Sequence, residues 1–151
     1  MIEPVDNSTV HILLAEDDEI DVKFIKRAFA RVWREQCIHV VSNGEEALAF
    51  LYRQGKYGDA PRPDLILLDL NMPRKNGFEV LEEIKQSKEL MHIPVVVLTT
   101  SKDEESVKQS YALHANSYIT KPTTFEELQR VVQMVVDYWM GTSRIPPRNL
   151  H

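Results

Sequence analysis

The chain has 151 residues, of which 43% are hydrophobic, a length and composition sufficient for one domain with a packed core. The net charge of -5 argues against a nucleic-acid partner, because phosphate binding relies on clustered Lys and Arg. Residues 1–6 lack the basic and apolar regions of a signal peptide, and no apolar run approaches the ~20 residues of a membrane span. We therefore expect a cytoplasmic protein without a membrane segment.

The first half of the chain alternates between strand and helix patterns. Residues 10–15, with the apolar run 12–15, predict a buried strand. A helix is expected from Asp18 or Glu19, because apolar residues recur at intervals of three and four: Val22, Ile25, Ala28, Phe29, Val32 and Trp33. A second strand over 37–41 precedes a helix that carries Ala47, Leu48 and Leu51. Residues 54–63 are rich in Gly and Pro and predict an exposed loop.

The second half continues the alternation. Strands are predicted over 64–69, 95–98 and about 117–120. Helices are predicted from Gly77 to before Pro94, over about 103–114 and over about 124–139. The helix over 103–114 has only a thin apolar stripe, mainly Val107 and Tyr111. Because parallel strands need crossover connections and these strands are solidly apolar, the pattern predicts an α/β fold with helices around a parallel sheet.

Polar side chains stand where the predicted strands end. Glu16 and Asp17 follow the first strand, Asp69 the third, Thr99 the fourth and Lys121 the fifth. The carboxyl ends of parallel strands meet at one edge of a sheet, so these groups should converge. Three clustered carboxylates are unfavourable without a cation, and hard oxygen ligands suit Mg²⁺. The sequence therefore predicts a magnesium site with a hydroxyl and an ammonium beside it.

This set of motifs resembles the receiver domain of two-component response regulators. The matching segments are Glu16-Asp17-Asp18, Asp69 with Asn71-Met72-Pro73, Thr99, and Lys121-Pro122. The resemblance covers about residues 9–140 and leaves 1–8 and 141–151 as terminal extensions. It implies a doubly wound, flavodoxin-like fold of five strands in the order 2-1-3-4-5, flanked by five helices.

The resemblance also implies a function. Asp69 would be the phosphoacceptor for a histidine kinase, which makes the chain a signalling protein rather than an enzyme with a separate substrate. The implied Mg²⁺ ligands are the Asp17 and Asp69 carboxylates and the backbone carbonyl of Asn71, with Glu16 acting mainly through water.

During transfer, charge develops on the phosphoryl oxygens. Mg²⁺, the Lys121 ammonium and the Thr99 hydroxyl would balance that charge. By the same resemblance, Pro122 is expected to hold the Lys121 peptide in cis.

Phosphorylation adds charge and acceptor oxygens, which can draw the Thr99 hydroxyl inward and free space for an aromatic on the next strand. Tyr118 stands where receivers carry that aromatic. We therefore assign Thr99 and Tyr118 as switch residues, coupled to the weakly anchored helix over 103–114.

The last helix is apolar over about half of its circumference, more than one core-facing stripe requires. One explanation is that the tail residues 144–147 fold back over Trp139. The explanation we favour is a homodimer through the surface from the fourth strand to the last helix.

A narrower resemblance concerns the partner. The loop 54–63, the acidic start of the first helix, residues 70–77 and the tail after Trp139 are similar to single-domain response regulators paired with bacterial and cyanobacterial phytochrome kinases. The phosphoryl donor would then be a histidine on a light-sensing kinase, and the downstream target another, unknown protein.

Two other functions share part of this pattern. A hydrolase of the haloacid dehalogenase type also uses an Asp at a strand end, but it commonly needs a second acid two residues later, where this chain has Asn71. A receiver-like module that is never phosphorylated would lose one of the site residues, and all are present. Asp17 or Asp18 could also simply cap the first helix. The lone Cys37 and the five histidines show no ligand spacing in the sequence and receive no role.

Overall fold

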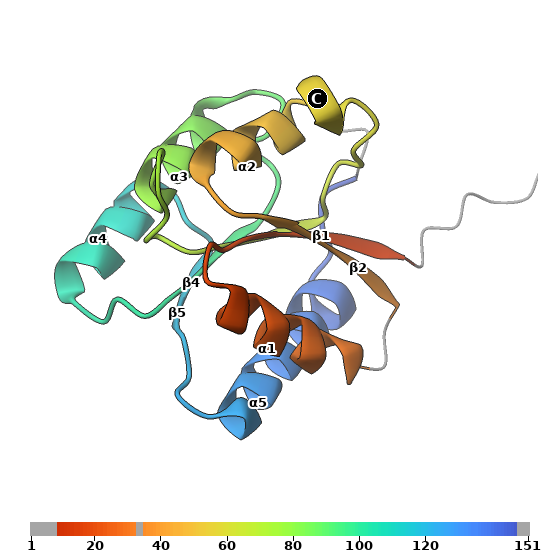
Figure 1. Cartoon of the computed structure of the whole chain (residues 1–151), viewed down its shortest axis with the longest axis vertical. Coiled ribbons are helices and arrows are strands. Elements are labelled where there is room, and N and C mark those ends of the chain that lie inside the picture. The colour runs from red at the N-terminus through yellow and green to blue at the C-terminus, as the bar shows by residue number, and fades with distance from the viewer. Residues whose placement is uncertain (1–8, 33–34, 148–151) are drawn as a thin grey trace, which may run out of the picture.

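The computed structural model describes residues 9–32 and 35–147. Its centre is a parallel sheet with strand order β2-β1-β3-β4-β5 (Figure 1), which confirms the predicted flavodoxin-like topology. Trp33, predicted on the first helix, lies outside the described residues. The five strands are β1 Val10–Ala15, β2 Gln36–Val41, β3 Leu65–Leu68, β4 Val95–Thr99 and β5 Ser117–Thr120.

Helices cover both faces of the sheet in two layers (Figure 1). One face is covered by α1 (Glu19–Ala30) and α5 (Phe125–Val136), and the other by α2 (Gly44–Leu51), α3 (Gly77–Gln86) and α4 (Glu104–Ala112). The predicted exposed loop contains one short 3-10 helix, η1 (Gly55–Tyr57).

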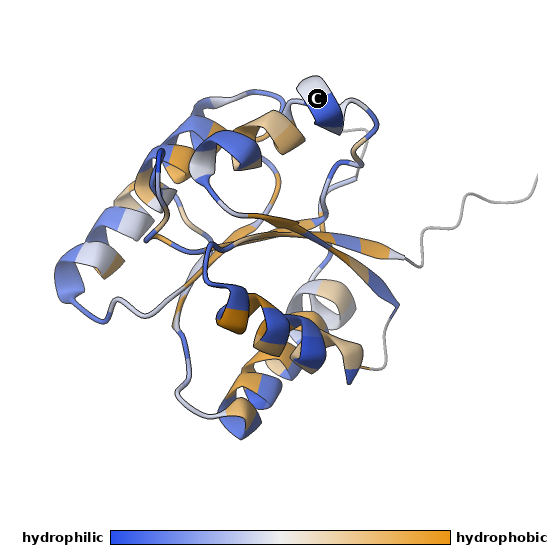
Figure 2. Ribbon diagram, in the orientation of Figure 1, coloured by the Kyte–Doolittle hydropathy of each residue, from blue (hydrophilic) through white to orange (hydrophobic). Residues whose placement is uncertain are grey.

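Two apolar cores lie between the sheet and these layers. The side chains of each inner strand alternate between them: Leu13 and Ile66 face α2 and α3, whereas Ile12 and Leu65 face α1 and α5. Because both faces are covered, β3 and β4 are buried along their whole length, as expected for inner parallel strands. Figure 2 shows the corresponding band of hydrophobic residues through the sheet and on the inner sides of the helices.

Every α-helix among the described residues begins with a side-chain cap that satisfies otherwise unpaired N–H groups. Asp18 caps α1 by accepting from the N–H groups of Ile20 and Asp21, so Asp18 rather than Asp17 has the capping role. Asn76 and Glu79 form a reciprocal capping box at α3. The caps of the remaining helices are Asn43, Asp103 and Thr124.

The structure differs from the sequence prediction at two helices. The winding expected to end at Trp139 becomes the π-helix η2 (Asp137–Thr142), closed by a bond from Ser143 N–H to the Tyr138 carbonyl. On α4, Tyr111 is not an anchor, because it is 49% exposed. The fully buried residue of α4 is Ser110, which bonds to the Ser106 carbonyl, so this helix is held even more loosely than predicted.

Among the described helices, none combines the length and the apolar character that crossing a lipid bilayer would require.

Candidate functional site

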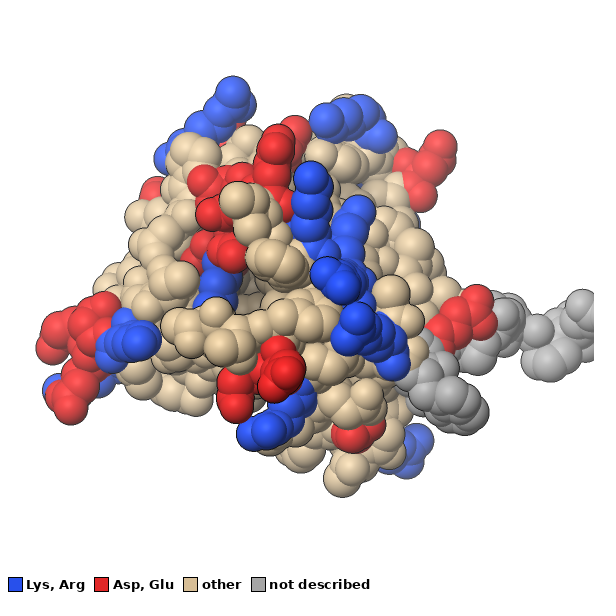
Figure 3. Space-filling model, turned by 60° about the horizontal axis from the view of Figure 1, so that its bottom comes forward, with Lys and Arg blue, Asp and Glu red and all other residues tan. Residues whose placement is uncertain are grey.

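Backbone bonds along the sheet place two acids side by side at its carboxyl edge. The N–H of Glu16 donates to the Val41 carbonyl at 2.9 Å, and the N–H of Asp69 donates to the Ala15 carbonyl at 3.0 Å. Both side chains are buried, with 2% and 5% exposure. Figure 3 shows acidic side chains gathered around a hollow on this side of the molecule, with basic atoms at its base.

Lys121 connects the acids of this edge. Its backbone N–H donates to the Thr99 carbonyl at 2.7 Å, which extends the β4–β5 pairing to the loop after β5. Its Nζ lies 2.5 Å from Glu16 Oε2, 2.9 Å from Asp21 Oδ2 and 3.2 Å from Asp69 Oδ2. One nearly buried ammonium is therefore shared among three carboxylates, which holds their oxygens in a fixed arrangement.

Burial and the neighbouring charges shift the pKa values of Glu16 and Lys121. Burial, together with the charge of Asp69, raises the pKa of Glu16 to about 7, against the lowering effect of its bond from Lys121. Burial alone would lower the pKa of Lys121, but bonds to Glu16 and Asp21 and the charge of Asp69 raise it above its usual value. The lysine therefore stays charged, whereas burial and the nearby Asp69 both disfavour the ionised form of Glu16.

Three of the acids fit a cation. Ligand oxygens of Glu16, Asp17 and Asp69 all lie within 4.8 Å of one another. Asp17 is exposed, so the group opens to solvent on one side. Lys121 alone does not neutralise the acids around it, and the donors are carboxylate oxygens with an open approach. This donor set suits a hard divalent cation that keeps several waters.

A chain of polar contacts leads from Asp69 to β5. The Asn71 N–H donates to Asp69 Oδ1 at 3.3 Å, and the Asn71 amide donates to Thr99 Oγ1 at 3.4 Å and Ser101 Oγ at 3.1 Å. The Tyr118 hydroxyl donates to the Ser101 carbonyl at 2.6 Å. Burial, and to a lesser extent the charges of Asp103 and Asp69, raise the pKa of Tyr118, so it remains a hydroxyl donor.

The family model described as "Response regulator receiver domain" matches residues 12–133. The chain belongs to the response regulator receiver family.

Its relatives include phytochrome response regulators. The chain is 44% identical over 135 residues to the response regulator Rcp1 of the cyanobacterium Synechocystis, covering 89% of this chain and 92% of that protein. Among solved structures, the phosphorylated cyanobacterial phytochrome response regulator RcpA is 43% identical with a TM-score of 0.88, covering 92% of this chain and 99% of that one. The Mn²⁺-bound form of Rcp1 is 43% identical with a TM-score of 0.86, covering 91% and 99%.

The receiver's predicted site residues come together at one edge of the sheet. Ion pairs join Lys121 to Glu16 and Asp69, and hydrogen bonds join Asn71 to Asp69 and Thr99. Of the other predicted site residues, Asp17 belongs to the cluster of three carboxylates, and the Tyr118 hydroxyl donates to the loop after β4.

One prediction about this receiver was wrong. No peptide bond is cis in the parts of the chain that the structure describes, so the Lys121–Pro122 bond is trans. The trans form is favoured by about 0.5–1 kcal/mol before Pro, and from it the Lys121 ammonium already reaches the three carboxylates.

Sequence reasoning missed two residues of the site. Asp21 lies in the first turn of α1 and binds the Lys121 ammonium. Lys121 lies 100 residues further along the chain, so no spacing in the sequence marks this contact. Ser101 links Asn71 to Tyr118, and its role depends on loop geometry that spacing does not reveal.

The close approach of α3 to the site requires a glycine. A Cβ on Gly77 would lie 2.4 Å from the Asp69 carbonyl oxygen and 2.6 Å from the Leu70 Cα. The Gly77 N–H also donates to the Leu70 carbonyl at 3.0 Å. The start of α3 therefore fixes the backbone on which Asp69 is carried.

Proposed function

We propose that this receiver is a single-domain response regulator that accepts a phosphoryl group on Asp69 from a histidine kinase and changes conformation to signal to a partner protein. One observation carries the proposal: Asp69 is the acid that belongs both to the group of three carboxylates and to the contacts of Lys121 and Asn71. The Asp69 carboxylate therefore lies between the candidate cation site and the hydrogen-bond donors of Lys121 and Asn71.

In the proposed reaction, a carboxylate oxygen of Asp69 attacks phosphorus. The new O–P bond forms as the P–N bond of the donor phosphohistidine breaks, and the histidine takes up a proton. The Lys121 ammonium, 3.2 Å from Asp69, and the Thr99 hydroxyl offer donors to the transferred oxygens. We assign the Mg²⁺ ligands to Asp17, Asp69 and the Asn71 carbonyl, with Glu16 acting through water. Bound Mg²⁺ would supply further positive charge at the phosphoryl oxygens.

The proposed switch uses the contacts around Ser101. In the unphosphorylated site, Thr99 Oγ1 accepts from the Asn71 amide, and Tyr118 is tied to the Ser101 carbonyl. A phosphoryl oxygen that attracts the Thr99 hydroxyl would shift this loop and release Tyr118. Because α4 follows directly and buries only Ser110, the movement would reach an exposed signalling surface.

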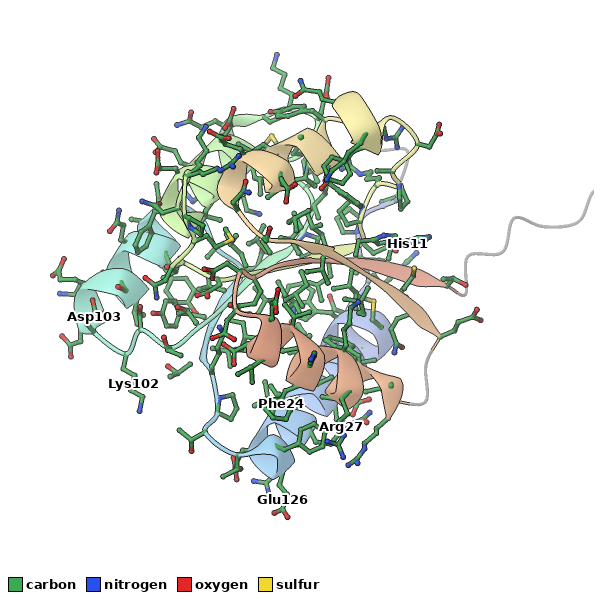
Figure 4. All side chains as sticks on the ribbon, viewed as in Figure 1. His11, Phe24, Arg27, Lys102, Asp103 and Glu126 are labelled. Atoms are coloured by element: carbon green, nitrogen blue, oxygen red, sulfur yellow. The ribbon has the colours of Figure 1, made fainter. Side chains whose placement is uncertain are left out.

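The surface around the pocket supports kinase docking. Exposed Phe24 on α1 lies 6.1 Å from Phe125 of α5, and together with Lys121 they line a hollow of about 220 Å³. Figure 4 shows Phe24 and Arg27 along α1 beside α5. Exposed basic side chains continue along α1, and Figure 3 shows a row of Lys and Arg beside the acidic group. A kinase helix with apolar and acidic side chains would fit this surface.

The proposed kinase is a phytochrome, because the solved relative RcpA is a cyanobacterial phytochrome response regulator. We place the transfer in the cytoplasm. Phosphotransfer to this chain from a purified phytochrome kinase should be faster than from an unrelated histidine kinase. Equal rates from both would contradict the pairing.

We also propose a homodimer through β4, β5 and α5. Met134 is 61% and Tyr138 54% exposed, and they line an apolar groove of about 270 Å³ beside β5. Of the tail, Pro146 lies against Pro63 and Ile93, just before β3 and β4, and does not line this groove. A dimer at tens of micromolar by light scattering is expected, and a monomer there would contradict it.

Incubation with acetyl phosphate and Mg²⁺, followed by intact-mass measurement, tests the central proposal. We expect one labile phosphoryl group on the wild type and none on Asp69→Asn. Turnover of many organic phosphates would favour a hydrolase instead. However, the Asn71 amide donates to Thr99 and Ser101 and offers no general acid. Absence of both labelling and turnover would favour a passive binding module.

A further inference from the structure

Three potential metal ligands of soft or borderline character meet on β1 and β2. The parallel register sets His11 directly beside Cys37, and His39 follows Cys37 by two residues on the same strand. Side chains two apart on a strand point to the same face, which here is the face that packs against α2. Sequence spacing alone did not show this cluster, because it depends on pairing between strands 26 residues apart.

The donor atoms are close to the spacing of a zinc site. One ligand atom from each residue lies within 4.8 Å of the other two. His11 Nδ1 and His39 Nε2 are 3.1 Å apart. Tetrahedral zinc, with bonds of ~2.0–2.1 Å to nitrogen and ~2.3 Å to sulfur, places its ligand atoms ~3.3–3.6 Å apart. The two nitrogens are slightly closer than that spacing, and a rotation of the side chains would bring the sulfur, which lies within 4.8 Å, into ligand distance.

The surrounding contacts hold both imidazole rings. The rings of His11 and His39 stack at 5.3 Å, and His39 lies 5.3 Å from the ring of Phe50 on α2. The backbone of His11 is held twice by Asp64, whose Oδ2 accepts from its N–H and whose N–H donates to its carbonyl. None of the three ligand residues is fully buried, so an ion has access from solvent.

We propose that His11, Cys37 and His39 form a binding site for Zn²⁺, with three protein ligands and a fourth position open to water. Imidazole nitrogens and a thiolate suit zinc, whereas Mg²⁺ prefers oxygen ligands. The hydrogen bond between His11 Nδ1 and His39 Nε2 requires an N–H on one ring and a lone pair on the other. Bound zinc would replace this hydrogen bond, because it would accept a lone pair from both nitrogens.

This site is separate from the phosphorylation pocket. His11 lies near the start of β1 and Glu16 just after its end, a separation of about 16 Å along the strand. In Figure 4, His11 is on the opposite side of the molecule from Lys102 and Asp103, which follow the phosphorylation edge of β4. Zinc binding here therefore does not depend on the proposed phosphotransfer.

Titration of the full chain with Zn²⁺ in excess Mg²⁺ tests the proposal. We expect one Zn²⁺ per chain, with affinity at least ~10-fold weaker in His11→Gln and His39→Gln. The matched control His92→Gln changes an exposed histidine outside the cluster and should bind like the wild type. Circular dichroism of each variant verifies that it is folded.

Substitution with Co²⁺ gives a second readout, because a cobalt–thiolate bond produces a charge-transfer absorption band. The band should appear in the wild type and be absent in Cys37→Ser, a change of similar size at a partly exposed position. Equal Zn²⁺ affinity in the wild type and both histidine variants, or absence of the cobalt band, would overturn the proposal. A loss of Zn²⁺ only in Asp17→Asn would also overturn it, by placing the ion among the acids.

Discussion

Glu16→Gln should stabilise the metal-free chain above neutral pH. The pKa of Glu16 is raised from 4.5 to about 7 in the folded chain, so the folded state holds a proton that the unfolded state releases. Stability is therefore lost as the pH rises from 4.5 to 7, and the full penalty applies above 7. Gln removes the ionisation but keeps the size of the side chain, and Lys121 retains Asp21 and Asp69 as partners.

The magnitude follows from this shift. At ~1.36 kcal/mol per pKa unit, the penalty of Glu16 is small at about pH 4.5, about 1 kcal/mol at about pH 5.5 and about 3 kcal/mol at about pH 8. The gain of the variant should follow the same curve. Added Mg²⁺ should narrow the difference at high pH, because a ligand that binds the folded wild type more tightly stabilises it more.

Urea unfolding of both proteins, with a chelator and then with Mg²⁺, measures these differences across the pH range. The control is Glu82→Gln, an exposed acid on α3, which should change stability by less than ~0.5 kcal/mol at every pH. The reasoning would be refuted if Glu16→Gln were less stable than the wild type near pH 8, or if its gain did not shrink toward acid pH.

Three further predictions concern the backbone of the site, kinase docking and the dimer. Gly77→Ala should cost about 1–3 kcal/mol and slow phosphorylation, because its Cβ meets the backbone of the phosphoacceptor, whereas Gly141→Ala has open space and should be neutral in urea unfolding. Phe24→Glu should slow transfer from the kinase but not labelling by acetyl phosphate. Met91→Glu, equally exposed on the other side of the sheet, should change neither rate, and equal slowing by both would contradict docking at α1. Met134→Glu should give a monomer by light scattering, and a persistent dimer would contradict the α5 interface.

The fold was predictable from the sequence because its signals are local. Solid apolar runs such as Ile66–Leu68 mark buried parallel strands, and the acids and hydroxyl at the strand ends follow from where those runs stop. The winding of the last helix beyond Val136 could not be predicted, since the change to a π-helix has no marked breaker residue before it.

The parts of the site that escaped prediction depend on contacts between segments distant in the chain. Asp21 reaches Lys121 across 100 residues, and Tyr118 meets the backbone carbonyl of Ser101 rather than a side chain. His11 and His39 likewise meet only through strand register. Such contacts require the positions of whole elements, which residue type and spacing do not supply.

Trapping the aspartyl phosphate tests the central claim most directly. After phosphorylation in Mg²⁺, reduction with borohydride converts an acyl phosphate on a carboxylate into a stable alcohol that peptide mass spectrometry can locate. The account predicts that this mark appears at Asp69 alone and disappears when Mg²⁺ is chelated before the phosphoryl donor is added. A mark on another acid, or labelling that is unchanged without the metal, would contradict it.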